Sequence, residues 1–335
     1  MHAGYEAKPY FDAGLLDPVN SLWTSEGLEE VIPRVVRVMC QFEGNYYSVP
    51  VDIHRANVVW YNKKILDSNN IDTADLTDWD SFFNACDKLK SAGIDYPIQM
   101  GTDWTAAHIF ESIMASEGID FYEEWINGKI VSAENEKLLD ALKTFKKYLS
   151  YVNPDNADLE WNDATERIVL GEGVFNVMGD WANGEFTVME KVYGVDYETF
   201  TVPGTKNMYG LVIDTFQHPK GIAHPVNSER WLKVVASKEG QDAFNPLKGS
   251  ISARIDTDVS KYGLYSKLAA IDFASAEYMF PSVVHGSGAP ESFKVKLKEV
   301  MADFVADLDV NKAAKAMTDY TKEISNEYSI EWELN

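Results

Sequence analysis

Hydrophobic positions along the chain form two kinds of pattern, helical stripes and short continuous runs. In residues 78–89, the side chains of Phe82, Cys86 and Leu89 share one helical face, and Gly93 follows as a stop signal. A second stripe occupies residues 132–149, at Leu138, Leu142, Phe145 and Leu149. Because residues three or four apart lie on one side of a helix, both segments predict amphipathic helices.

Five short apolar runs predict strands. They are residues 47–53, 58–61, 174–178, 200–203 and 209–213. Residues 163–166 have capping-box chemistry, so we expect Asp163 to cap a helix that Gly171 ends. Asn227 is expected to cap another helix, in which Trp231 faces the core.

Helical and strand-like segments alternate along the chain, and residues 261–328 are mostly helical in pattern. This alternation predicts an α/β architecture. A chain of 335 residues exceeds the usual size of one hydrophobic core, so two lobes are expected. The sequence contains no low-complexity linker, which indicates that the chain crosses between the lobes several times.

The charge of the chain limits its partners. Lys and Arg total 30 against 53 Asp and Glu, a formal charge of -23, which repels nucleic acids and anionic membrane surfaces. No segment approaches eighteen uninterrupted apolar residues, and the start lacks signal-peptide features. We therefore expect neither nucleic-acid binding nor membrane insertion. The two cysteines, Cys40 and Cys86, imply no disulfide framework.

Common catalytic and metal-binding motifs are absent from the sequence. No two of the six histidines have the i, i+4 spacing of a helical zinc site, and there is no C-x-x-C, G-x-G-x-x-G or G-x-S-x-G pattern. We therefore predict no metal and no cofactor. Paired carboxylates are abundant in an acidic chain, so a glycosidase stays open as an alternative on composition alone.

The segment VFNVMGDWANGEF, residues 174–186, places an indole where a buried strand ends. The apolar run breaks at Gly179, and Asp180 and Trp181 follow. An indole offers a flat apolar face that can stack on the C–H face of a pyranose ring. Ligand stacking and an ordinary core role are the two interpretations of Trp181, and its position after a strand favours stacking.

Four blocks in order carry a family resemblance. They are SVPVDIHRANVVWYNKKIL at 48–66, GEGVFNVMGDWANGEF at 171–186, YGLVIDTFQHPKG at 209–221 and LKGSISAR at 247–254. Together they resemble extracellular solute-binding proteins of ABC sugar importers, and within these the subgroup that binds glucose, galactose or mannose. The similarity covers nearly the whole chain.

The resemblance implies a two-lobed α/β fold of the type II periplasmic-binding-protein kind, with a ligand cleft between lobes that close by hinge motion. Lobe I is expected to comprise residues 1–53 and 215–253, and lobe II residues 54–214 and 254–335. Family members carry a further stretch before the segment HAGYE at residues 2–6. Lobe I is therefore expected to be incomplete at its N-terminus.

The resemblance also implies a function. Such proteins are not enzymes: they bind a monosaccharide and deliver it to an ABC permease, as monomers in the periplasm or at the outer cell surface. A carbohydrate hydrolase and a sugar-sensing protein that docks to a receptor are the alternatives.

Matching the family pattern residue by residue implies ligand contacts at Trp181, Asp214, Lys248, His285, Trp161 and His2. Ordinary structural alternatives are a core role for the two tryptophans, a helix or turn cap for Asp214 and a solvated amine for Lys248. His54 and Arg55 end the strand that crosses between the lobes, so we expect them to face the cleft as well. A structural ion pair is an equal alternative for these two.

Overall fold

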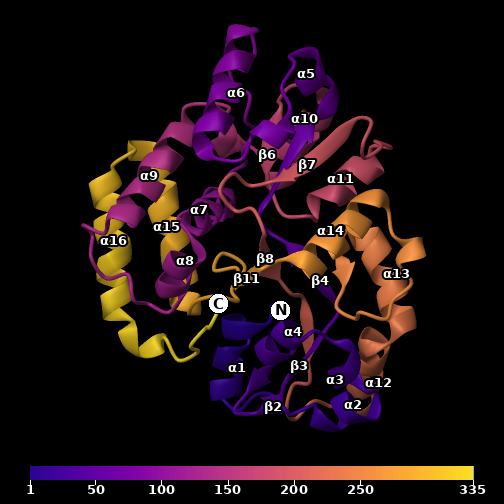
Figure 1. The fold of residues 1–335 in the computed structure, drawn as a ribbon. Helices are drawn as coiled ribbons and strands as arrows, with labels where there is room; N and C mark the ends of the chain where they lie inside the picture. The colour runs from indigo at the N-terminus through magenta and orange to yellow at the C-terminus, as the bar shows by residue number, and fades with distance from the viewer. Residues whose placement is uncertain (335) are drawn as a thin grey trace.

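The apolar runs assemble into sheets that organise two lobes in the computed structural model, which describes residues 1–334 (Figure 1). In the upper lobe of the figure, β5 (Val58–Asn62) lies between β6 (Phe175–Val177) and β7 (Tyr197–Thr201) and is antiparallel to both. All five residues of β5 are buried. Around this sheet are α5 (Lys63–Ser68), α6 (Trp79–Ser91), α10 (Trp161–Leu170) and α11 (Ala182–Val188).

A group of packed helices completes this lobe. At its centre is α7 (Trp104–Ser116), in which residues 105–115 are all buried. The helices that pack with it, directly or through one another, are α8 (Ile119–Ile126), α9 (Glu136–Leu149), α15 (Glu291–Asp307) and α16 (Val310–Glu323). The buried stripe of α9 includes Leu138, Leu142 and Phe145, as its pattern predicts.

The other lobe is built on shorter elements. The hairpin β1 (Gln41–Phe42) and β2 (Asn45–Tyr46) accompanies a two-stranded antiparallel sheet of β3 (Ser48–Pro50) and β9 (Thr215–Gln217). Its helices are α1 (Lys8–Asp12), α2 (Asn20–Ser25), α3 (Leu28–Val31), α4 (Arg34–Met39), α12 (Pro225–Ala236) and α13 (Lys238–Lys248). The N-terminal incompleteness of this lobe stays a prediction.

A mixed sheet joins the two lobes. Its order is β10 (Ile251–Ser252), β4 (Asp52–Arg55), β8 (Met208–Val212) and β11 (Tyr278–Pro281), with α14 (Leu264–Ser275) packed near β10. The chain runs from β3 into β4, and antiparallel to it from β8 into β9. The chain therefore passes between the lobes along adjacent segments, as expected, while the lobe boundaries stay a prediction.

Three local predictions need correction. Residues 47–53 form two strands in different sheets, because the chain changes partner at Val51. Glu160 caps α10, and Asp163 is the reciprocal partner in that capping box. The helix that contains Asn227 begins two residues earlier, at Pro225, where the fixed φ of proline suits the first helical turn.

The buried face of α12 also differs from the prediction. Leu232, Val235 and Ala236 are buried, whereas Trp231 is 52% exposed. The Trp231 ring packs edge-on against Phe216, with 5.7 Å between centroids. The helix is thus rotated by about one position relative to the predicted stripe. Cys40 and Cys86 are both free and buried. Within residues 1–334, no helix combines the length and apolarity needed to cross a membrane.

Candidate functional site

A cavity of about 790 Å³ lies between the lobes and is lined by side chains from both. From one lobe come residues at the starts of α7 and α10 and along α11, and from the other the end of α13 and the residues that follow β8. Seven of the residues predicted from sequence line it: His2, His54, Trp161, Trp181, Asp214, Lys248 and His285. The structure therefore brings together side chains that lie up to 283 positions apart.

Trp181 forms part of the aromatic wall of the cavity. It follows β6 and stands as the N-cap residue of α11, with its ring partly exposed. The ring lies edge-on to His285, with 4.8 Å between centroids. A Cβ at Gly179 would come within 2.2 Å of the indole. Glycine is needed at that position because the indole folds back over the end of the strand.

Trp104 is a lining residue that the sequence interpretation missed. It opens α7, directly after Asp103, whose φ is +57°. Its ring lies 6.1 Å from Trp181 and 5.3 Å from His285. A tryptophan at the head of a largely buried helix is indistinguishable from a core residue by pattern. The available signal was the Gly-Thr-Asp turn before it, which takes the start of the helix to the surface.

Polar groups converge on the same cavity. Asp214 follows β8 by two residues, and its side chain is 32% exposed. Burial and the nearby Asp52 carboxylate raise the pKa of Asp214. Lys248 is the last residue of α13 and is exposed. Gly249 then ends that helix with φ +89°, a conformation that few other residues adopt readily.

His285 is positioned by a buried carboxylate behind it. Glu111 on α7 accepts hydrogen bonds from Ser282 Oγ at 2.7 Å and from the backbone N–H groups of Val283 and Val284, both at 2.9 Å. Burial raises the pKa of Glu111 to about 7, although these donors act in the opposite direction. The Nε2 atom of His285 lies 3.2 Å from Nδ1 of His108.

The surroundings of both histidines favour the neutral form of the ring at neutral pH. Burial holds the pKa of His285 well below its usual range, and the neighbouring His108 adds to this effect. Burial also lowers the pKa of His108 to about 4. A neutral imidazole can donate at one ring nitrogen and accept at the other, so His285 offers a polar contact without a charge.

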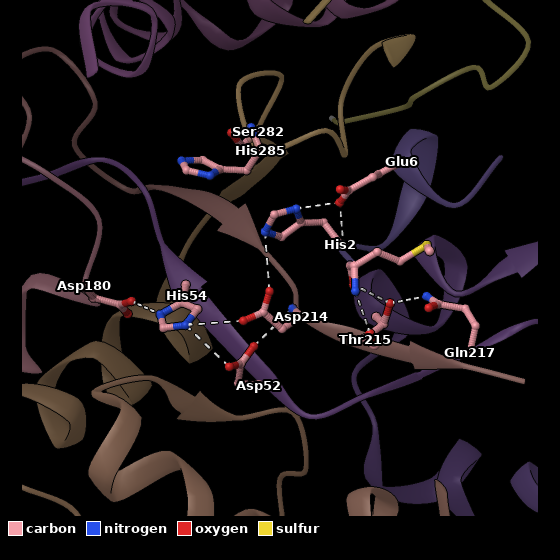
Figure 2. Close-up of polar contacts among 11 residues, drawn as sticks. His2, Glu6, Asp52, His54, Asp180, Asp214, Thr215, Gln217, Ser282 and His285 are labelled. Carbon is pink, nitrogen blue, oxygen red and sulfur yellow. Dashed lines mark hydrogen bonds and ion pairs between the residues drawn. The ribbon is translucent and has the colours of Figure 1, made fainter. Parts of the chain in front are cut away.

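His54 and His2 are each held by carboxylates, as Figure 2 shows. The His54 ring is buried and donates from Nδ1 to Asp180. Burial lowers the pKa of His54, but Asp180 and Asp52 outweigh it and raise the value to about 10. His2 Nδ1 lies 2.6 Å from Glu6 Oε2, and its Nε2 lies 3.4 Å from Asp214 Oδ1.

Arg55 does not line the cavity. Its guanidinium contacts Asp272 Oδ2 and Thr201 Oγ1, at 2.5 Å and 3.1 Å, and lies over the Tyr209 ring. The side chain of Arg55 thus points away from the side of β4 that His54 presents to the cavity, because neighbouring residues alternate along a strand. Of the two interpretations considered for Arg55, the structure shows the ion pair.

We expect Arg55→Met to reduce stability without affecting ligand binding. Asp272 is 49% exposed, so water can solvate it once its partner is gone. The free energy of unfolding should fall by about 1–2 kcal/mol, as measured by urea denaturation. If the substitution reduced ligand affinity more than threefold, Arg55 would have to be counted among the ligand-binding residues.

Two groups of side chains have potential metal ligands close together. In the first, His108, Glu111 and His285, both Glu111 oxygens already accept hydrogen bonds from the loop after β11. That carboxylate is therefore committed to the Ser282 hydroxyl and to two backbone N–H groups. In the second group, Asp52, His54 and Asp214, the buried atoms Asp52 Oδ2 and His54 Nε2 face one another without a hydrogen bond.

The geometry agrees with comparisons to known proteins. Residues 1–242 match the family of bacterial extracellular solute-binding proteins. The chain belongs to this family. It is 38% identical to an uncharacterized ABC transporter extracellular-binding protein of Pyrococcus horikoshii, over the whole of this chain and 76% of that protein.

Further relatives agree with this assignment. The chain is 28% identical to a probable sugar-binding periplasmic protein of Mesorhizobium japonicum, over 96% of this chain and 78% of the relative. Among solved structures, the bacterial solute receptor AcbH superimposes with a TM-score of 0.84 over 97% of this chain and 84% of that receptor. The sequence identity there is 15%, so this similarity shows the fold.

Proposed function

We propose that this chain binds a monosaccharide such as glucose, galactose or mannose in the cavity between its lobes and delivers it to an ABC permease. The observation that carries the proposal is one cavity lined both by the rings of Trp104, Trp161 and Trp181 and by the polar side chains of Asp214 and Lys248. At about 790 Å³, the cavity has the size usual for small-molecule sites.

The aromatic wall suits a pyranose ring. One face of a pyranose is a patch of C–H groups, and an indole presents an extended apolar face of matching size. The same cavity is lined by groups that suit the hydroxyl edges of the sugar. A carboxylate such as Asp214 accepts from two hydroxyl groups, Lys248 donates to a sugar oxygen, and neutral His285 can do either.

The expected affinity follows from these contacts. A stacked pair contributes roughly 1 kcal/mol beyond the burial of area. Each hydrogen bond contributes about 0.5–1.5 kcal/mol net, or about 1.5–3 kcal/mol where a charge takes part. After the cost of immobilising the ligand, five or six such contacts give about -8 kcal/mol, a micromolar dissociation constant.

Relatives support the sugar and the transport role. The Mesorhizobium japonicum relative is described as a probable sugar-binding periplasmic protein, and the Pyrococcus horikoshii relative as part of an ABC transporter. A family of extracellular binding proteins acts outside the cytoplasmic membrane. These descriptions support the proposal that the chain acts in the periplasm or at the outer cell surface with a permease as its partner. We propose that it does so as a monomer.

Isothermal titration calorimetry with glucose, galactose, mannose, xylose and arabinose tests the proposal. We expect one binding site per chain and a micromolar dissociation constant for at least one hexose, because a hexopyranose offers a C–H face for stacking and several hydroxyl groups for the polar contacts. Absence of heat with every sugar in the panel would contradict it. Turnover of a chromogenic glycoside, abolished by a single Asp or Glu substitution, would instead favour a hydrolase.

A further inference from the structure

Three polar side chains meet at the floor of the cavity. Asp52 and His54 lie two positions apart on β4, so they share one face of the strand. Asp214, which follows β8, faces them. One ligand atom from each of the three lies within 4.8 Å of the others, and Figure 2 shows one edge of the His54 ring facing both carboxylates.

The atoms that face one another have no hydrogen-bond partner. His54 Nε2 and Asp52 Oδ2 are both buried and form no hydrogen bond, in side chains that are 2% and 0% exposed. They lie 3.4 Å apart, and His54 Nε2 lies 3.9 Å from Asp214 Oδ2. Leaving such groups unpaired in the interior is costly, so their arrangement indicates a missing partner.

These separations suit two ligands of one metal ion. They exceed the usual length of an N–H···O hydrogen bond, about 2.7–3.2 Å. Two ligands bound at roughly 2.0–2.1 Å to a tetrahedral zinc ion lie about 3.3–3.4 Å apart. The observed separations of 3.4 Å and 3.9 Å need little adjustment to reach that geometry.

Neighbouring groups fix the orientation of the candidate ligands. Asp180 binds Nδ1 of His54 and accepts the Arg55 N–H at 3.0 Å with its other oxygen. Asp52 Oδ1 accepts the N–H of Asp214 at 3.0 Å. His54 Nδ1 and Asp52 Oδ1 are therefore hydrogen-bonded within the protein, which leaves His54 Nε2 and Asp52 Oδ2 to bind an ion between them. A carboxylate that orients a histidine in this way is a regular feature of metal sites.

His2 repeats this arrangement on the other side of Asp214. Glu6 holds its Nδ1 at 2.6 Å, and its Nε2 lies 3.4 Å from Asp214 Oδ1. The His2 backbone also forms a bridge with Asp214. His2 therefore holds Asp214 by its Oδ1 atom and leaves Oδ2 to the cluster. One imidazole and two carboxylates leave the fourth position of a tetrahedral ion to water, and a mixed nitrogen and oxygen set favours zinc over calcium or magnesium.

We propose that Asp52, His54 and Asp214 bind a divalent cation of the zinc class, with His2 orienting Asp214. A dication would also offset the repulsion among the carboxylates of Asp52, Asp180 and Asp214, which surround a single buried imidazole. Because His2, His54 and Asp214 line the cavity, the ion would lie within reach of a bound oxygen ligand. Spacing in the sequence predicts no metal, since Asp52 and Asp214 are 162 positions apart.

Titration of metal-depleted protein with Zn²⁺, without sugar, tests the site. We expect one ion per chain by calorimetry, and Co²⁺ in its place should give the intense visible absorption of tetrahedral coordination. Asp52→Asn should abolish the tetrahedral spectrum. Asp180→Asn should weaken Zn²⁺ binding about 10- to 100-fold, as loss of an orienting carboxylate does in other sites.

His224→Gln is the matched control, since His224 is exposed at the start of α12. Asparagine at position 52 retains an oxygen that can accept the Asp214 N–H, so the variant should fold, and its melting curve in EDTA checks this. The proposal is overturned if no stoichiometric ion binds, or if Asp52→Asn leaves the Co²⁺ spectrum unchanged. Loss of binding in His224→Gln instead would also overturn it. Sugar titrations in EDTA test the proposed function separately.

Discussion

Replacing Trp181 with alanine is expected to weaken sugar binding by about 30- to 100-fold, a loss of about 2–3 kcal/mol. The substitution removes the stacking contact and also the apolar area that the sugar would bury. It opens the aromatic wall as well, because the Trp181 ring packs against His285 and Trp104. Calorimetry with whichever sugar the wild-type protein binds best measures the effect.

Trp231→Ala provides the matched control for this prediction. Trp231 is 52% exposed on α12 and does not line the cavity, so its removal should leave the affinity within about twofold of wild type. Trp181→Phe retains a flat ring and should give an intermediate affinity. If Trp181→Ala bound sugar as tightly as Trp231→Ala, the stacking role of Trp181 would be wrong.

The sequence predicts the elements of this fold better than their ends and their orientation. Val58–Asn62 and Met208–Val212 are strands where continuous apolar runs indicate them. Residues 47–53 look like one strand but belong to two sheets, because the change of partner at Val51 depends on the distant β8 and β9. Trp231 is exposed because the rotation of a surface helix is set by tertiary packing, which outweighs a stripe displaced by one position.

The candidate site likewise has residues that the sequence predicts and residues that only the structure identifies. Family motifs identify Trp181, Asp214 and His285, and the structure brings all three to one cavity. Trp104 was missed because its exposure depends on how α7 meets the cavity, which no local pattern records. The grouping of Asp52 with His54 and Asp214 arises from the pairing of β4 with β8. Sequence alone could not predict that pairing.

Glu111 should make the stability of the protein depend on pH. In the folded state burial raises its pKa from 4.5 to about 7. Between these values the folded protein binds more protons than the unfolded chain, so the free energy of unfolding falls as the pH rises. For this fully buried carboxyl group, the fall should be roughly 2–3 kcal/mol between pH 5 and pH 8.

Glu111→Gln isolates this contribution, because glutamine does not titrate and still offers an oxygen to the N–H groups of Val283 and Val284. Urea denaturation of both proteins at intervals from pH 5 to pH 8 gives the difference in unfolding free energy at each pH. As the pH rises, the Glu111→Gln variant should become more stable relative to the wild-type protein. The contributions of other titrating groups to the unfolding free energy largely cancel in this difference, since both proteins contain them.

The exposed Glu124→Gln on α8 is the control, and its difference from wild type should be constant over this range. A constant difference for Glu111→Gln as well would show that the three donors from Ser282, Val283 and Val284 fully compensate the burial of the charge. Glu111 would then be ionised throughout. If the difference instead varies with pH as expected, deprotonation of Glu111 strengthens its hydrogen bonds to residues 282–284, next to His285. The same deprotonation lowers the stability of the whole fold.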